Sequence, residues 1–177
     1  PTWLLDPDLP MIILSVMVVL VGLGLGAGDN LHYMLRTFNW RMLLLPLCTI
    51  VGTLLFSALG VLVLRGFSLT DCLAVGSGFG YYSLSSIFIT EYKGAELGTI
   101  ALLANISREI LTLLAAPLLV RWFGNLAPIS AGGATTMDTT LPIITRTAGQ
   151  QFVVVSIFHG FVVDFSVPFL VTLFCSI

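Results

Sequence analysis

Charged side chains are scarce in this sequence of 177 residues. Asp, Glu, Lys and Arg together make up 9% of it, whereas soluble domains carry roughly 25%. Hydrophobic residues make up 57% and the mean hydropathy is +1.05. This composition excludes an ordinary soluble domain and predicts an all-α integral membrane protein. No basic run with interleaved aromatic residues is present, so nothing indicates a nucleic-acid partner.

Cysteine and the common catalytic motifs are also missing or sparse. Cys48, Cys72 and Cys175 lie far apart, beside apolar runs, and show no CxxC or Cys/His spacing. The sequence therefore predicts no metal site and no cofactor. It also lacks HExxH, a P-loop and a recognisable Ser-His-Asp arrangement. We accordingly expect a protein that is not an enzyme.

Long apolar runs are abundant instead, and many approach the ~20 residues that one membrane span needs. They predict a polytopic helix bundle that forms a single transmembrane domain over residues 1–177. The expected membrane-entering segments are 9–28, 42–64, 72–90, 97–122, 126–149 and 151–176. The fifth is predicted to be a broken, discontinuous helix. The third is rich in Gly and Ser, and it is either a closely packed helix or a bent element that lines a pathway.

The few charges also bear on orientation in the membrane. If every segment crosses, the connections at 29–41 and 91–96 share one side, whereas Arg65 and Arg121 lie on the other. The first side then holds a slight excess of basic residues, which favours placing that side in the cytoplasm. The sequence thus predicts a multi-pass protein with both chain ends outside the cytoplasm.

A polar cluster interrupts the apolar segment 97–122. Glu109 lies ~18 Å along a helix that begins at Leu97, close to the bilayer midplane. Asn105 is one turn earlier on the same face, while Arg108 is rotated by ~100°. A charge at the midplane costs at least ~2.5–3.5 kcal/mol and is a functional-site hypothesis. The alternative is that Arg108 and Glu109 are buried partners that only fix helix packing.

The stretch 132–142 combines glycines, threonines, one carboxylate and a proline. Gly132 and Gly133 are expected to break the helix, and Pro142 fits the first turn of the next one. We expect that half-helix to begin at or beside Asp138. Asp138 would then bind a cation or proton with free backbone carbonyls and with the hydroxyls of Thr135, Thr136, Thr139 and Thr140. The alternative is a capping aspartate without a ligand.

Glu109 and Asp138 would together deliver two carboxylates to the membrane interior. Burial and mutual repulsion favour a proton on one of them, which is the minimal chemistry of an antiporter. A Na⁺/H⁺-type antiporter and a non-transporting scaffold subunit are the alternatives. His159 is interpreted as a hydrogen-bonded core residue, although a proton relay stays open. Asp164 lies ~140° from His159 around a helix. Two interpretations of Asp164 stay open: it lines a cavity, or it has no role there.

Several of these stretches closely resemble the lysine exporter LysO family. They are 78–84 (GFGYYSL), 102–109 (LLANISRE), 133–142 (GATTMDTTLP), the pair His159-Gly160 and 167–170 (VPFL). The resemblance is specific over most of residues 70–177 and rests on hydropathy before them.

This resemblance implies an exporter of L-lysine in the bacterial inner membrane that exchanges lysine for protons. The functional acids of the family fall on Glu109 and Asp138. A fold with inverted repeats, akin to the cation/proton antiporter and anion transporter superfamily, is also implied. Family members usually carry further residues before this region, so the resemblance implies a separate membrane subunit or a homodimer. Asp164 is not a position of the family pattern.

Overall fold

The structure is a computed structural model that describes residues 40–64 and 66–177. All regular secondary structure within these ranges is helical, which confirms the all-α class. The elements are η2 (Trp40–Leu43), α3 (Leu44–Leu59), η3 (Gly60–Leu62), α4 (Leu69–Gly76), α5 (Tyr82–Lys93), α6 (Ala95–Phe123), α7 (Ala127–Gly132), η4 (Gly133–Met137), α8 (Leu141–Ala148), η5 (Gln150–Phe152) and α9 (Val153–Ser176). The segment predicted at 9–28 lies outside the described residues.

Three helical stretches are long and apolar enough to cross a membrane. They are Leu44–Leu62, Ala95–Phe123 and Gln150–Ser176, with mean hydropathies of 2.1, 1.5 and 1.9. The 29 residues of α6 extend over ~43 Å at ~1.5 Å per residue, more than the ~30 Å hydrocarbon core. Large apolar side chains such as Leu55 and Phe56 of α3 are mostly exposed, as expected on a surface that faces lipid. The prediction of a membrane protein is therefore confirmed.

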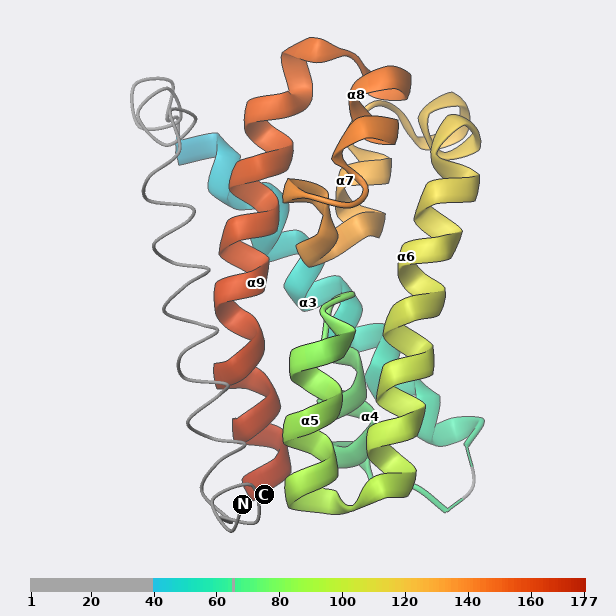
Figure 1. Ribbon diagram of the computed structural model, residues 1–177, viewed down its shortest axis with the longest axis vertical. Helices are drawn as coiled ribbons and strands as arrows, with labels where there is room; N and C mark the ends of the chain where they lie inside the picture. Colours follow the sequence, from blue (N-terminus) through green and yellow to red (C-terminus); the bar gives the residue numbers. More distant parts are fainter. Residues whose placement is uncertain (1–39, 65) are drawn as a thin grey trace, which may run out of the picture. The chain divides into compact units, whose positions relative to one another are not determined.

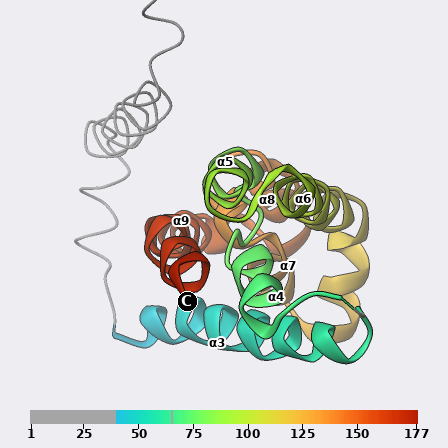
Figure 2. The ribbon, with the colours of Figure 1, turned by 90° about the horizontal axis from the view of Figure 1, so that it is seen from below.

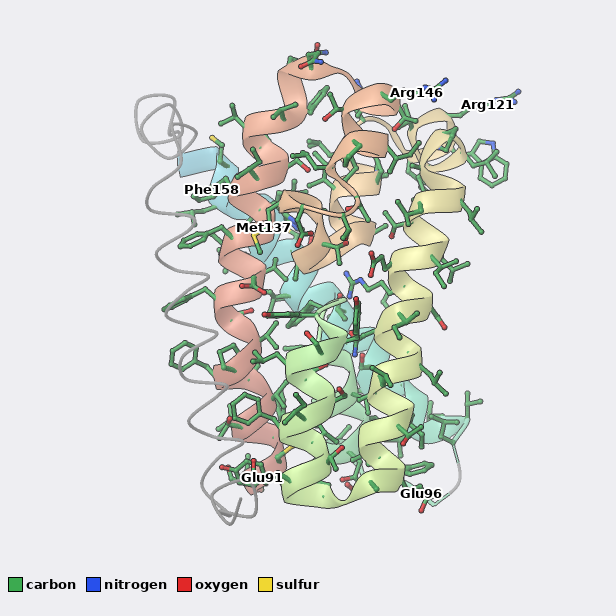
Figure 3. The ribbon with its side chains drawn as sticks, in the orientation of Figure 1. Glu91, Glu96, Arg121, Met137, Arg146 and Phe158 are labelled. Atoms are coloured by element: carbon green, nitrogen blue, oxygen red, sulfur yellow. The ribbon has the colours of Figure 1, made fainter. Side chains whose placement is uncertain are left out.

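The shorter helices form two hairpins that enter from opposite ends (Figure 1). Figure 3 places Arg121 and Arg146 at one end, Glu91 and Glu96 at the other, and Met137 between them. The first hairpin, α4 and α5, starts and finishes at the Glu91 end. The second, α7, η4 and α8, starts and finishes at the Arg121 end. The tips of both hairpins therefore lie near the middle of this part of the molecule.

One ion pair corrects the predicted placement of the connections. Lys93 Nζ lies 3.7 Å from Asp71 Oδ1 in the first turn of α4, so the start of α4 and the connection at 91–96 share an end. The prediction that the connection before α4 lies on the side opposite to 91–96 is wrong. Segment 72–90 has the length of one span, but its chain reverses between α4 and α5. Helices of 8 and 12 residues reach only ~12 and ~18 Å.

Asp71 also fixes the start of α4. Its side chain accepts a hydrogen bond from the Ser68 backbone amide (2.9 Å), and the Ser68 hydroxyl accepts one from the Asp71 amide (3.1 Å). This capping box satisfies two amides that the helix cannot pair internally. Burial works to raise the pKa of Asp71, but the Ser68 hydrogen bonds and the charge of Lys93 outweigh it and lower the pKa below 3.8.

The long helices support the two hairpins. Seen from below, α4 lies between α3 on one side and α5 and α6 on the other (Figure 2). Helix α9 packs against η4 as well as α4 and α5. Near the Arg121 end, Ile129 of α7 and Ile144 and Ala148 of α8 form a buried apolar cluster. The hairpins are thus held between membrane-length helices.

Candidate functional site

The tips of the two hairpins touch through their backbones. The amide of Ala134 donates a 2.9 Å hydrogen bond to the carbonyl oxygen of Phe79. Gly133 has φ 64° and ψ −127°, a conformation that side chains other than glycine strongly disfavour. A Cβ atom at Gly133 would also overlap the Phe79 carbonyl oxygen. Glycine is therefore required here for both conformation and space.

Phe79 itself holds a conformation that is rare for its residue type. Its φ is 45°, which is an outlier for a bulky side chain and costs of order 1–3 kcal/mol. The side chain is fully buried, and the Arg108 guanidinium carbon lies 5.9 Å from its ring centroid. This cation–π contact and the bond to Ala134 hold the strained turn in place.

Asn105 of α6 holds the tip of the first hairpin. Its Oδ1 accepts a 2.8 Å hydrogen bond from the Gly80 amide. Its Nδ2 donates to the carbonyls of Val75 (3.2 Å) and Ala101 (2.9 Å). The side chain is 3% exposed, so it satisfies buried backbone groups where α4 ends.

Arg108 holds the second hairpin in the same manner. Its Nε and Nη2 donate to the carbonyl oxygens of Ala131 (2.7 Å) and Ser130 (3.1 Å). Nη1 lies 3.4 Å from the Thr53 hydroxyl oxygen. Ser130 and Ala131 are in the last turn of α7, where the unpaired carbonyls carry negative partial charge. A cation in this position stabilises the end of a helix that stops in the middle of the structure.

Glu109 is mostly buried. Among the described residues, no hydrogen bond or ion pair joins its carboxylate to Arg108, Asp138 or any other group. The alternative of an Arg108–Glu109 ion pair therefore finds no support in this part of the chain. Because Glu109 follows Arg108 on α6, it lies one residue from the place where the hairpins meet.

Asp138 is exposed and ends η4. Its Oδ1 accepts hydrogen bonds from the Thr139 backbone amide and, at 3.3 Å, from the Thr139 hydroxyl. Helix α8 begins at Leu141 with Thr140 as its N-cap residue, and Pro142 lies in the first turn. The half-helix thus begins three residues after Asp138, and Asp138 does not cap it.

The predicted threonines mostly serve the backbone of η4. The Thr135 hydroxyl donates to the Gly132 carbonyl (3.0 Å), and the Thr140 hydroxyl donates to the Thr135 carbonyl (3.0 Å). The Thr136 hydroxyl lies 2.8 Å from the Gly133 carbonyl. These side chains therefore hold the turn that follows Gly132. Thr139, which is exposed, is the one of the four that contacts Asp138.

His159 lies in a buried row of hydroxyl groups. Its Nε2 is 2.9 Å from Thr49 Oγ1, and its Nδ1 is 3.2 Å from Thr136 Oγ1. Thr49 Oγ1 is in turn 2.7 Å from Ser130 Oγ. The imidazole is fully buried with a partner at each ring nitrogen, which agrees with the interpretation of a hydrogen-bonded core residue. It ties α9 to α3 and η4.

Asp164 is a neighbour of Asp138 that sequence patterns could not identify. Asp138 follows η4, and η4 packs against α9, the helix that carries Asp164. Asp164 is mostly buried on α9. The signal in the sequence was an aspartate within an apolar helix, but nothing there indicated which element it faces.

Two cavities lie beside α3 in the described structure. One, of about 240 Å³, lies between α3, α4 and α6 and has Arg108 and Asn105 among its lining residues and Asp71 farther along. The other, of about 650 Å³, lies mainly between α3 and α7. Thr53 and Ser57 of α3 line both. Within the described ranges, no group of His, Cys, Asp and Glu is arranged to hold a metal ion.

These features define a helical membrane protein with polar groups at the meeting point of two hairpins. Residues 2–175 match the family model described as lysine exporter LysO, and the chain belongs to this family. The description of this family names an exporter, which is a class of transporter.

Two curated relatives show the extent of the likeness. The lysine exporter LysO of Escherichia coli K12 is 32% identical over 163 residues, which cover 92% of this chain and 54% of that protein. A candidate lysine exporter of Haemophilus influenzae Rd is 41% identical over 108 residues, 61% of this chain and 55% of that protein. The chain thus spans about half the length of these relatives. No solved structure matches it.

Proposed function

We propose that this chain forms part of an inner-membrane exporter of L-lysine, driven by proton antiport. The observation that carries this proposal is the family match over residues 2–175, together with two hairpins that meet beside the polar cluster of α6. Irregular backbone at membrane depth is tolerated where it lines a protein cavity. Broken helices near the midplane are the usual architecture of transporter sites, and the two hairpins are candidates for this role.

Glu109 and Asp138 are the proposed carboxylates for substrate and proton. Glu109 is mostly buried and has no protein partner in the described residues, so it is available to an ammonium group or a proton. Asp138 is exposed and follows η4, which packs against α9, the helix that carries Asp164. Alternate occupation by a proton and by lysine would couple their movements in opposite directions.

Proton entry also fits the energetics of export. Expelling a cation against an inside-negative potential costs ~2.3 kcal/mol per 100 mV. Exchange for one entering proton cancels that electrical cost. The matched residues cover 54% and 55% of the two relatives, so the proposal concerns the part of the exporter that corresponds to this chain.

Counterflow of radiolabelled lysine in reconstituted vesicles tests the proposal. The vesicles hold this chain, and vesicles without protein serve as the blank. We expect Glu109→Gln and Asp138→Asn to abolish lysine counterflow, whereas Glu96→Gln, at the exposed start of α6, leaves it unchanged. Full activity of both neutralised variants would refute the role of these acids. Exchange of Na⁺ in place of lysine would favour the Na⁺/H⁺ alternative.

A further inference from the structure

The Arg108 guanidinium has no anionic partner in the described residues. Its three contacts go to neutral groups, the carbonyls of Ala131 and Ser130 and the hydroxyl of Thr53. The ion pair found within these ranges joins Lys93 and Asp71 instead. Arg108 is only partly exposed; a charge removed from water is ordinarily paired, and an intramembrane one is expensive. Arg108 is therefore a candidate binding group for an anion.

The guanidinium also has unused donors. It carries five N–H groups, and the contacts with Ala131, Ser130 and Thr53 use three of them, which leaves two. The planar fork of arginine matches the two oxygens of a carboxylate better than any other side chain does. Nη1 and Nη2 each keep one N–H, so both free donors belong to the terminal nitrogens.

A space for such an anion lies directly beside Arg108. The 240 Å³ cavity is lined by Arg108, Asn105, Thr53 and Ser57 and is far larger than the ~30 Å³ share of one water. It extends toward Asp71, whose carboxylate is at the end of the molecule with Lys93. Thr53 and Ser57 also line the second cavity, and Thr53 is a contact of the guanidinium.

We propose that Arg108 binds the α-carboxylate of the amino acid in the cavity of about 240 Å³. This proposal rests on the proposed function and specifies how that site distinguishes an amino acid from a simple diamine. Lysine and cadaverine (1,5-diaminopentane) share two amino groups on a five-carbon chain, and only lysine carries the carboxylate. Arg108 thus selects amino acids over amines that lack a carboxylate.

Competition in the counterflow assay tests the proposal in the wild-type chain. Unlabelled L-lysine should compete roughly tenfold or more better than cadaverine, the loss typical when a charge-assisted hydrogen-bonded partner is removed. Arg108→Lys should weaken competition by lysine about tenfold and leave competition by cadaverine unchanged. Arg121→Lys, at the exposed end of the same helix, is the matched control and should alter neither. A merely structural role would weaken both competitors alike and would overturn the proposal.

A chemical measurement on the wild-type chain covers the case in which the variant does not fold. Phenylglyoxal modifies arginine, and peptide mass spectrometry separates Arg108 from Arg121. Lysine should protect Arg108 from modification, cadaverine should not, and Arg121 should react equally throughout. Equal protection by both compounds, or protection by neither, overturns the proposal. Lysine counterflow by the wild-type chain decides the proposed function independently of Arg108. Counterflow without selective protection of Arg108 refutes only the role of Arg108, whereas absence of counterflow refutes the proposed function.

Discussion

Replacement of Gly133 by alanine should weaken the contact between the two hairpin tips. The new Cβ would overlap the carbonyl oxygen of Phe79, and the φ of 64° is unfavourable for alanine. The hairpins must separate to relieve the overlap. Separation also lengthens or breaks the 2.9 Å hydrogen bond from Ala134 to Phe79.

The size of this effect follows from two contributions. A disfavoured backbone conformation costs of order 1–3 kcal/mol, and a buried group left without its hydrogen-bond partner costs about 1–3 kcal/mol. Their sum is about 2–6 kcal/mol. For a chain of this size each kcal/mol lowers Tm by roughly 2–4 °C, so the smallest sum corresponds to about 4–8 °C.

Thermal unfolding in detergent, followed by tryptophan fluorescence, measures this loss. Gly52→Ala is the matched control, because no atom lies within 4 Å of the Cβ added there and alanine favours a helix. We expect the control to melt at or slightly above the wild-type temperature. If Gly133→Ala melts together with the control, the inferred contact between the hairpins is refuted.

Two further stability measurements probe the elements around this contact. Asn105→Ala should lower Tm by several degrees, because the buried Gly80 amide loses its acceptor, which costs about 1–3 kcal/mol. The control Thr99→Ala removes an exposed hydrogen bond within α6 and should leave Tm unchanged. Equal Tm values for the two variants would contradict the role of Asn105. Asp71→Asn should lower Tm at neutral pH but not in acid. The pKa of Asp71 in the folded chain lies below 3.8, so the ionised carboxylate stabilises the fold above pH 3.8. This stabilisation is lost as the pH falls through the folded pKa. A Tm difference that persists unchanged in acid would contradict the latter reasoning.

Much of the class and some of the site could be predicted from the sequence. The scarcity of charge specifies a membrane protein because apolar helices are stable in lipid. Asn105 and Arg108 stood out because polar groups in an apolar helix are costly unless they have partners. Gly133 and Pro142 marked an interruption because backbone conformation is local. The family resemblance rested on contiguous stretches, which are equally local.

Only the tertiary structure decided how these residues are combined. Segment 72–90 has the length of a span, and only the ion pair of Asp71 with Lys93 reveals that its chain returns to the same end. Arg108 of α6 donates to backbone carbonyls of the second hairpin, and backbone carbonyls carry no sequence signature. The proximity of Asp138 to Asp164 likewise depends on how η4 packs against α9. Local periodicity specifies a helix and its polar positions, whereas contacts between distant elements depend on where the chain reverses.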